Sequence, residues 1–354
     1  MTRVRVLVVD DSVVSRRFLT ESLGREADLE MLRPAPNGRL GVTRAKEESP
    51  DVVILDVQMP DMDGLETITE IRKAGCSMPV IMFSASTEHG AATTLEALSR
   101  GASDYVTKPT ALRSGEGAAE EVREQLLQKI RALTQSARPV VARRSEGQRA
   151  TERRNRPVRA IVIGVSTGGP NALGRLMPMF PADLPVPILI VQHMPPMFTR
   201  FLAERLDKIC PLHVREAEHG VEIRPGEVWL APGNFHMRAV RSGPFARLEL
   251  DQGEPENSCR PAADVLFRSA VEVYGGDILA MVLTGMGQDG LRGCVAIREA
   301  GGQILTQDRA SCVVWGMPRF VEESGLSDAV LPLDELAAEA VRRLNRSSRV
   351  VTSQ

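Results

Sequence analysis

The sequence predicts an α/β fold with two doubly wound, mainly parallel-sheet domains. The chain has 354 residues, 43% of them hydrophobic, which is enough for two domains that each bury a core. In both halves, short β-branched runs alternate with amphipathic segments, the pattern of βα repeats. Between the halves, apolar periodicity disappears over residues 136–159. Strands joined by helices run parallel and need helices on both faces, so each half predicts its own doubly wound sheet.

In the first half, Val4–Val9 is the first predicted strand, and apolar residues at helical spacing follow it as far as Leu23. A closing helix is predicted at residues 120–133. We assign residues 1–134 to this first domain. Its further strands are predicted at Val52–Leu55, Pro79–Phe83 and Tyr105–Thr107.

Residues 135–157 are predicted to form a flexible, arginine-rich linker. Eight arginines and two glutamates lie between residues 136 and 159, which indicates a solvated tether, with a docking patch for an acidic partner as the alternative. The second domain is assigned to residues 158–346, and a C-terminal tail to residues 347–354. Its strands are predicted at Ala160–Val165, Ile188–Val191, Ile278–Leu283 and Gln303–Thr306, with a helix near residues 171–177.

Composition and charge exclude several kinds of partner. A formal net charge of -2 and a pI near 6.3 give no overall positive potential that would attract nucleic acid or an anionic membrane. The linker arginines also lack the pattern of a DNA-recognition helix. The five cysteines are scattered without a metal or disulfide pattern, as in reducing compartments. No apolar run approaches the roughly 18 residues of a membrane span, and no signal-peptide pattern opens the chain. We expect a monomeric, soluble, cytoplasmic protein that neither binds nucleic acid nor inserts into a membrane.

Acidic residues end two of the predicted strands in the first domain. Asp10 and Asp11 follow the first strand, and Asp56 follows the strand at 52–55. The carboxyl ends of parallel strands meet at one edge of the sheet, so we expect the three carboxylates to converge there. Two unit charges about 4 Å apart repel by roughly 4 kcal/mol at an effective dielectric constant of about 20. The cluster therefore predicts a divalent cation, and oxygen ligands favour Mg²⁺.

Two more polar residues, Ser84 and Lys108, follow strands at the same edge and could hold phosphoryl oxygens. The whole set resembles the receiver domain of two-component response regulators, over about residues 1–130. That resemblance implies a flavodoxin-like fold and a Mg²⁺-dependent phosphorylation, with a receiver that no longer accepts phosphate as the alternative. The motifs are Asp10-Asp11, Asp56 with Met59-Pro60 and Asp63-Gly64, Ser84-Ala85, and Lys108-Pro109.

The receiver resemblance also implies a role for each of these residues. Asp56 is the expected phosphoacceptor, Ser84 and Lys108 are expected to contact the phosphoryl group, and Tyr105 is the expected aromatic switch. The expected Mg²⁺ ligands are Asp10, Asp11, Asp56 and the carbonyl of Gln58.

In the second domain, a glycine-rich turn at 164–170 joins a strand to a helix and contains Ser166. Such a turn either cradles a dinucleotide or exposes a nucleophilic hydroxyl. It lacks the G-x-G-x-x-G spacing, and the next strand is followed by His193 instead of a ribose-binding carboxylate. We therefore predict a nucleophile at Ser166 with His193 as general base. Asp289, in another glycine-rich turn, is the predicted orienter of the histidine.

Beyond these residues, the second domain resembles the catalytic domain of the chemotaxis-specific protein-glutamate methylesterases and glutaminases over about residues 158–335. That resemblance implies a Rossmann-like serine esterase. The matching stretches are 164–169, 192–196, 198–199, 202–206, 231–233, 236–237, 259–261, 264–267, 284–287, 289–290 and 315–318. One departure is Met197, which stands where a small residue, usually glycine, is expected after the proline pair, and it bears on the shape of the substrate groove.

The methylesterase resemblance implies hydrolysis of γ-glutamyl methyl esters to glutamate and methanol, and a related deamidation of glutamine, both through an ester on Ser166. Thr167 and the backbone amide of Met286 are expected to help build the oxyanion pocket. No cofactor is expected for the esterase reaction. The implied substrates are methyl-accepting chemotaxis receptors and the implied phosphodonor is a chemotaxis histidine kinase, so that phosphorylation would activate the esterase for sensory adaptation.

Two other functions stay open for the second domain. It could bind receptors or another protein without turnover, or it could bind a nucleotide, which the missing ribose carboxylate disfavours. Cys259 precedes Arg260-Pro261, and because no base stands beside it in the sequence pattern, we do not predict it to be the nucleophile.

Overall fold

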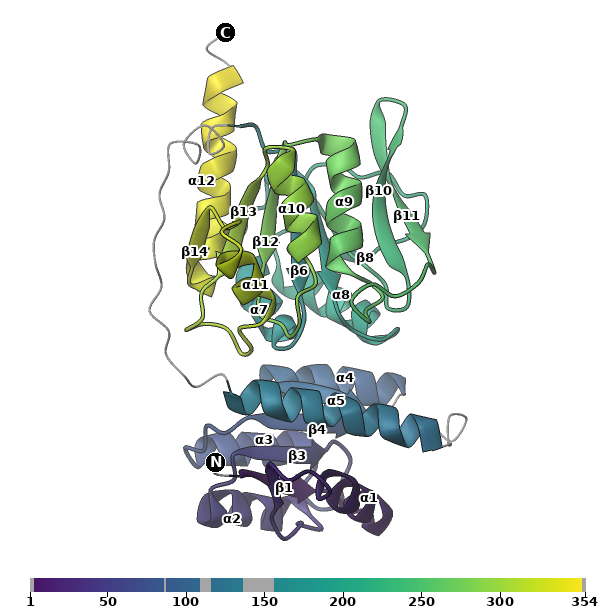
Figure 1. Cartoon of the computed structure of the whole chain (residues 1–354), viewed down its shortest axis with the longest axis vertical. Helices are drawn as coiled ribbons and strands as arrows, with labels where there is room; N and C mark the ends of the chain where they lie inside the picture. Colours follow the sequence, from purple (N-terminus) through teal and green to yellow (C-terminus); the bar gives the residue numbers. More distant parts are fainter. Residues whose placement is uncertain (1–2, 86, 109–115, 136–155, 352–354) are drawn as a thin grey trace. The chain divides into compact units, whose positions relative to one another are not determined.

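The computed structural model describes residues 3–85, 87–108, 116–135 and 156–351. The chain divides into two compact units, Met1–Pro139 and Val140–Gln354, which are described separately. Most of the predicted linker, like Pro109, lies outside the described residues. Both units are mainly parallel α/β structures, which confirms the predicted fold class (Figure 1).

The first unit is a five-stranded parallel sheet with the strand order β2-β1-β3-β4-β5. Its central strands are fully buried, as expected for a sheet covered by helices on both faces. In chain order the elements are β1 (Val4–Val9), α1 (Val13–Leu23), β2 (Leu29–Met31), α2 (Gly38–Glu48), β3 (Val52–Asp56), α3 (Gly64–Lys73), β4 (Val80–Ser84), α4 (Glu88–Ser99), β5 (Asp104–Thr107) and α5 (Glu116–Gln135).

Helix caps explain why the loops at the carboxyl edge of this sheet are short. Ser12 begins α1 by accepting the backbone N–H of Ser15, only three residues after β1 ends. Asp63 and Thr87 cap α3 and α4 in the same way. Each cap satisfies an N–H group at a helix start that would otherwise lack a partner. Short, capped loops hold the residues at the strand ends in fixed positions.

The second unit is built on a seven-stranded parallel sheet with the order β14-β13-β12-β6-β7-β9-β8, and a separate antiparallel hairpin, β10-β11. In chain order the elements are β6 (Ala160–Val165), α7 (Gly169–Leu176), η2 (Met177–Met179), β7 (Ile188–Gln192), α8 (Phe198–Ile209), β8 (His213–Glu216), β9 (Glu227–Leu230), β10 (His236–Ser242), β11 (Phe245–Asp251), α9 (Ala263–Tyr274), β12 (Ile278–Val282), α10 (Leu291–Glu299), β13 (Gln303–Gln307), α11 (Met317–Glu323), β14 (Ala329–Leu331) and α12 (Leu333–Val351).

The topology of the second sheet places three chain segments side by side. From β6 the chain proceeds to β7 on one side, and β12 later pairs with the other side of β6. All three strands are fully buried and run in the same direction. Their carboxyl ends therefore meet at a topological switch point, where open α/β sheets bind ligands. Helix α9 packs against β6 and β12 and against the hairpin strand β10, which closes one hydrophobic core.

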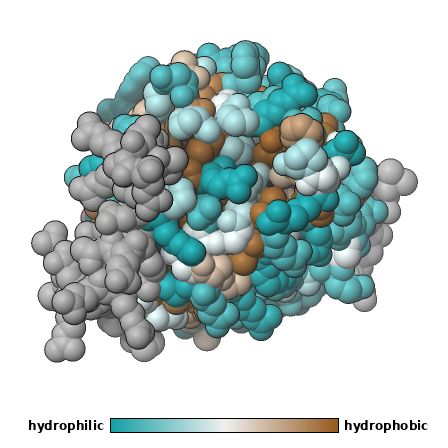
Figure 2. Space-filling view, turned by 90° about the horizontal axis from the view of Figure 1, so that it is seen from above, coloured by the Kyte–Doolittle hydropathy of each residue, from teal (hydrophilic) through white to brown (hydrophobic). Residues whose placement is uncertain are grey.

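Few large hydrophobic side chains are exposed among the residues that the structure describes. Figure 2 shows hydrophilic residues over most of the face that it draws, with smaller hydrophobic areas between them. None of the described helices has the length and apolarity needed to cross a bilayer. The exposed large hydrophobic residues among those described are Val13, Val14, Met179, Ile209, Phe245 and Val295.

Candidate catalytic and phosphoryl-binding sites

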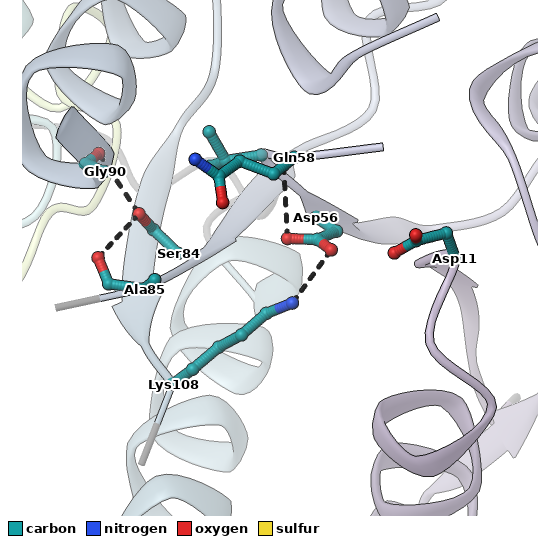
Figure 3. Close-up of a pocket in the computed structure, with 8 residues that line it drawn as sticks. Asp11, Asp56, Gln58, Ser84, Ala85, Gly90 and Lys108 are labelled. Atoms are coloured by element: carbon teal, nitrogen blue, oxygen red, sulfur yellow. Dashed lines mark hydrogen bonds and ion pairs between the residues drawn. The ribbon is translucent and has the colours of Figure 1, made fainter. Parts of the chain in front are cut away.

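The carboxyl edge of the first sheet carries a pocket of about 310 Å³ (Figure 3). Asp10 and Asp11 follow β1 and Asp56 ends β3, and these strands are neighbours. One carboxylate oxygen from each lies within 4.8 Å of the others. Lys108, directly after β5, places Nζ 2.8 Å from Asp56 Oδ2 and 3.1 Å from Asp10 Oδ2. The structure thus brings together the predicted acidic cluster and its lysine.

Charge and burial in this pocket suit a cation. Burial raises the pKa of Asp56, although the hydrogen bond from Lys108 opposes the rise. Burial lowers the pKa of Lys108, but Asp56 and Asp10 outweigh burial and raise it. One lysine partly neutralises three carboxylates, and the remaining donors are all oxygens close enough to share one ion. The residues therefore fit a hard divalent cation such as Mg²⁺.

The other residues predicted for this site lie at different depths. Gln58 is exposed, and its backbone N–H lies 3.4 Å from Asp56 Oδ1. Ser84 is fully buried, with its Oγ 3.1 Å from the carbonyl oxygen of Gly90. Figure 3 shows this hydroxyl on the side of Gly90, while Lys108 reaches Asp56. Tyr105 lies in β5, and burial raises its pKa well above the usual value. It is not among the described residues that line the pocket.

In the second unit, the predicted base and its orienter are in direct contact. His193 follows β7 and Asp289 lies in the turn between β12 and α10, and His193 Nε2 lies 2.7 Å from Asp289 Oδ2. Asp289 is 1% exposed. Its carboxylate also accepts the backbone N–H groups of Ala263 (2.6 Å), Asp264 (3.0 Å) and Gly290 (3.0 Å). A carboxylate held by so many donors stays fixed and charged, which suits an orienter.

Two residues that the sequence analysis did not single out complete this network. Asn257 Nδ2 donates to Asp289 Oδ1 and to Asp264 Oδ2, each at 3.0 Å. Asp264 Oδ1 accepts the backbone N–H of Gly293 at 2.6 Å. Asn257 has a φ of 53°, a left-handed conformation that asparagine tolerates better than most residues. The Asp264-Val265-Leu266-Phe267 stretch was noted only as part of a matching motif, so spacing gave no sign of this contact.

The pKa values follow from these contacts. Burial raises the pKa of Asp289, but the hydrogen bond with His193 and the backbone donors outweigh burial and lower it. Burial raises the pKa of Asp264 to about 6, and the neighbouring Asp289 carboxylate adds to the rise. Burial lowers the pKa of His193, but Cys259 and Asp289 outweigh burial and raise it to about 10. Of the two aspartates, Asp289 is therefore the one that carries the negative charge toward the histidine.

Ser166 lies beside this pair at the end of the central strand. Val165 of β6 pairs with Gln192 of β7, and His193 donates its backbone N–H to the Val165 carbonyl at 3.2 Å. Ser166 and His193 thus follow paired residues on strands that lie about 4.8 Å apart. Among the described residues, no hydrogen bond joins the Ser166 hydroxyl to the His193 ring.

The second ring nitrogen of His193 faces a thiol instead. Cys259 Sγ lies 3.6 Å from His193 Nδ1. The sequence pattern shows no base beside Cys259, but the structure places the His193 ring there. The sequence pattern could not show this contact because the two residues are 66 positions apart and come from loops on different elements. Cys259, His193 and Asp289 therefore form a thiol, imidazole and carboxylate chain in the structure.

Two hydrogen bonds tie the Ser166 turn to the loop after β12. Ser166 donates its own N–H to the Thr284 carbonyl at 3.0 Å, and Thr284 Oγ1 donates to the Thr167 carbonyl at 2.9 Å. The next residue, Gly285, has no room for a side chain, because a Cβ there would lie 2.7 Å from Ser166 Cβ. Within the described part of the chain, the N–H groups of Thr167 and Met286 donate to no protein acceptor. Their predicted part in an oxyanion pocket stays a prediction.

Met197, the departure noted above, begins α8 with a φ of 70°. This left-handed conformation favours glycine, which accounts for the glycine expected there. Met197 therefore occupies a strained position in the loop between β7 and α8, four residues after His193.

Gly169, the first residue of α7, is expected to be intolerant of alanine. A Cβ at Gly169 would lie 1.8 Å from Gln192 Oε1, and the Gln192 amide holds the Ser166 carbonyl through a 3.0 Å hydrogen bond. We expect Gly169→Ala to lower the free energy of unfolding by about 1–3 kcal/mol, measured by urea denaturation. The matched control is Gly174→Ala in the same helix, where a Cβ meets nothing within 4 Å. This control should gain up to about 1 kcal/mol; equal stability of the two variants would contradict the packing argument.

Comparison with known proteins agrees with this geometry. The chain matches the CheB methylesterase family over residues 161–340 and the response regulator receiver domain over residues 6–118. A protein-glutamate methylesterase/protein-glutamine glutaminase of Trichodesmium erythraeum is 48% identical over 351 residues, 97% of this chain and 100% of that protein. A relative of the same name from Nocardioides is 47% identical, covering 98% of this chain and 97% of the relative. The solved CheB methylesterase catalytic domain of Thermotoga maritima is 42% identical, with a TM-score of 0.52, and covers 52% of this chain and 98% of that one.

Proposed function

Because this chain belongs to the CheB methylesterase family and carries a receiver domain, we propose that it is a phosphorylation-activated protein-glutamate methylesterase and protein-glutamine glutaminase. The observation that carries the proposal is the fixed His193–Asp289 pair, 2.7 Å apart, beside Ser166 at three neighbouring strand ends. The substrates are glutamyl methyl esters and glutamines on methyl-accepting chemotaxis receptors, and the result is sensory adaptation.

In the proposed reaction, Ser166 Oγ attacks the γ-carbonyl carbon of the ester while the His193 ring accepts the hydroxyl proton. Because Asp289 occupies Nε2, Nδ1 is the ring nitrogen that takes this proton. The ring must then exchange its contact with Cys259 for one with Ser166. Asp289 stabilises the imidazolium that forms, and the N–H groups of Thr167 and Met286 stabilise the oxyanion.

Collapse of the tetrahedral intermediate releases methanol, or ammonia from glutamine, with the proton returned by His193. A water then attacks the glutamyl ester of Ser166, again with His193 as base, and leaves glutamate. The chain supplies the nucleophile, the base and the oxyanion donors, so this reaction needs no cofactor. The direct test is methanol release from a methylated receptor fragment, with and without a phosphodonor and Mg²⁺.

The first unit supplies the control. We assign Asp56 as phosphoacceptor, with a chemotaxis histidine kinase as donor. Asp10, Asp11, Asp56 and the Gln58 carbonyl would hold Mg²⁺, which offsets negative charge when a phosphoryl group arrives. Lys108 Nζ, already 2.8 Å from Asp56 Oδ2, would bind a phosphoryl oxygen. Ser84 would have to turn from Gly90 toward the phosphoryl group, and Tyr105 would respond as the aromatic switch.

Replacing Asp56 by asparagine is expected to remove phosphoryl control. With acetyl phosphate and Mg²⁺, the wild-type rate of methanol release should rise, whereas the ratio of stimulated to unstimulated rate in Asp56→Asn should be one. The reason is that an amide cannot accept the phosphoryl group. Asp61→Asn is the matched control, because Asp61 is exposed in the same loop and its φ of 66° suits asparagine. Stimulation of Asp56→Asn equal to that of the wild type would refute the assignment.

A further inference from the structure

The contact between Cys259 and His193 has no role in the proposed esterase reaction. Sγ lies 3.6 Å from Nδ1, and the opposite ring nitrogen is fixed by Asp289. A thiol that shares a proton with an imidazole is reactive, because the thiolate is the nucleophilic form and the imidazolium stabilises it. The carboxylate behind the ring strengthens this effect. The arrangement is that of an activated thiol, although Ser166 lies at the same edge of the sheet.

Cys259 is also held in place. It ends a turn in which Glu256 and Cys259 exchange backbone hydrogen bonds of 3.1 and 2.9 Å. Within the turn, Asn257 is tied to Asp289 and Asp264 by 3.0 Å hydrogen bonds. Arg260, the next residue, donates to the side chain of Asn234 and to the carbonyls of Gln252 and Gly253. The turn therefore holds the thiol against the ring, while Cys259 itself remains partly exposed to solvent.

The other cysteines of the second unit have a different environment. Burial raises the pKa of the Cys210 thiol to about 12, and Asp207 adds to the rise. Burial also raises the pKa of Cys294 and of Cys312, with nearby carboxylates acting in the same direction. Among the described residues, no hydrogen bond joins any of these three thiols to a histidine. They favour the neutral thiol, which is the unreactive form.

We propose that Cys259 is a modification site for hydroperoxides and small alkylating electrophiles, and that its modification stops turnover by occupying His193 Nδ1. The effect on turnover rests on the function proposed above. The modification itself rests only on the Cys259–His193–Asp289 geometry.

The oxidation step balances with a hydroperoxide as the oxidant. The Cys259 thiolate attacks one peroxide oxygen, so an S–O bond forms and the O–O bond breaks. The sulfur loses two electrons and the peroxide gains them. With hydrogen peroxide, the departing hydroxide takes the proton from the His193 imidazolium and leaves as water. The products are a sulfenic acid on Cys259 and a neutral His193. The added oxygen, or an alkyl group in its place, would lie against His193 Nδ1, the nitrogen that must take the proton of Ser166 in the proposed reaction.

Iodoacetamide labelling of the full chain tests the modification site without any need for turnover. The labelling rate of every cysteine is followed in one sample by mass spectrometry of digested protein. Cys259 should be labelled about 10-fold or more faster than Cys210 or Cys312, because the His193 ring, 3.6 Å away, can take the thiol proton as the carbon–sulfur bond forms. In His193→Gln the labelling of Cys259 should fall by about the same factor, while Cys210 keeps its rate as the internal control. Equal rates for Cys259 and Cys210 in the wild type would overturn the proposal.

Hydrogen peroxide tests the effect on turnover. Each variant is compared with its own untreated rate of methanol release. The wild type and Cys210→Ala should lose activity in step with oxidation of Cys259, whereas Cys259→Ala should keep its own untreated rate. Full activity after complete oxidation of Cys259 would overturn the blocking step. If the untreated wild type released no methanol while Cys259 was labelled rapidly, the esterase function would fail and the modification site would stand.

Discussion

Ser166→Ala is expected to lower methanol release from a methylated receptor fragment by about 10³-fold or more, the scale on which hydrolases lose rate when the nucleophile is removed. Alanine keeps the turn but removes the atom that forms the glutamyl ester. The Ser166 backbone would still accept from Gln192 and donate to Thr284, so folding should be unchanged. Methanol release at saturating fragment and a thermal melt of the same sample are the two measurements.

The matched control is Ser324→Ala, at an exposed serine just after α11. The turnover of Cys259→Ala should be compared with that of Ser166→Ala as well, because the Cys259 thiol contacts the His193 ring. If Cys259→Ala lost turnover while Ser166→Ala kept it, the nucleophile would be the Cys259 thiol and not the Ser166 hydroxyl. An inactive wild type whose Asp56 is phosphorylated would favour a second domain that binds receptors without turnover.

Asp289→Asn is expected to lower kcat by about 10²- to 10⁴-fold. The carboxylate accepts from His193, Asn257 and three backbone N–H groups, and an asparagine replaces one accepting oxygen with a donor. One of these donors would then face another donor, which should also lower the free energy of unfolding by about 1–3 kcal/mol. Rates must therefore be measured well below the melting temperature of the variant.

The same variant has an expected pH signature. Cys259 and the Asp289 carboxylate both favour the charged imidazolium and raise the pKa of His193. Removing the carboxylate lowers that pKa, and because the base must be neutral, the acid limb of the kcat/KM profile should move to lower pH. Asp183→Asn, in an exposed loop, is the control for loss of one charge. A profile whose acid limb stays at the wild-type pH would contradict the assigned contact between Asp289 and the catalytic base.

Sequence alone determined the fold class and the family, because buried parallel strands appear as continuous apolar runs that periodicity detects. The runs Val4–Val9 and Ala160–Val165 coincide with β1 and β6. The strands β8, β9 and β14, of three or four residues, were not predicted, whereas the equally short β5 was predicted at Tyr105–Thr107. Hairpin β10-β11 was also not predicted, although its seven-residue strands are longer.

The sequence also predicted which candidate residues lie close together, because the carboxyl ends of parallel strands meet at one edge of the sheet. On this ground it placed Asp10, Asp11 and Asp56 near one another, and likewise Ser166 and His193. Their chemical roles stay predictions that the experiments above address.

Only the tertiary structure decided what surrounds the histidine. Cys259 and Asn257 lie in a turn before α9, in which Asn257 and Ser258 adopt positive φ angles. That turn is separated from His193 by a helix, two strands and a hairpin, so no spacing rule relates them. The path of the chain over the sheet sets the 3.6 Å contact between the thiol and the ring and places Asn257 between two aspartates. Local sequence encodes periodicity and turns, whereas contacts between distant loops exist only once the sheet has fixed their positions.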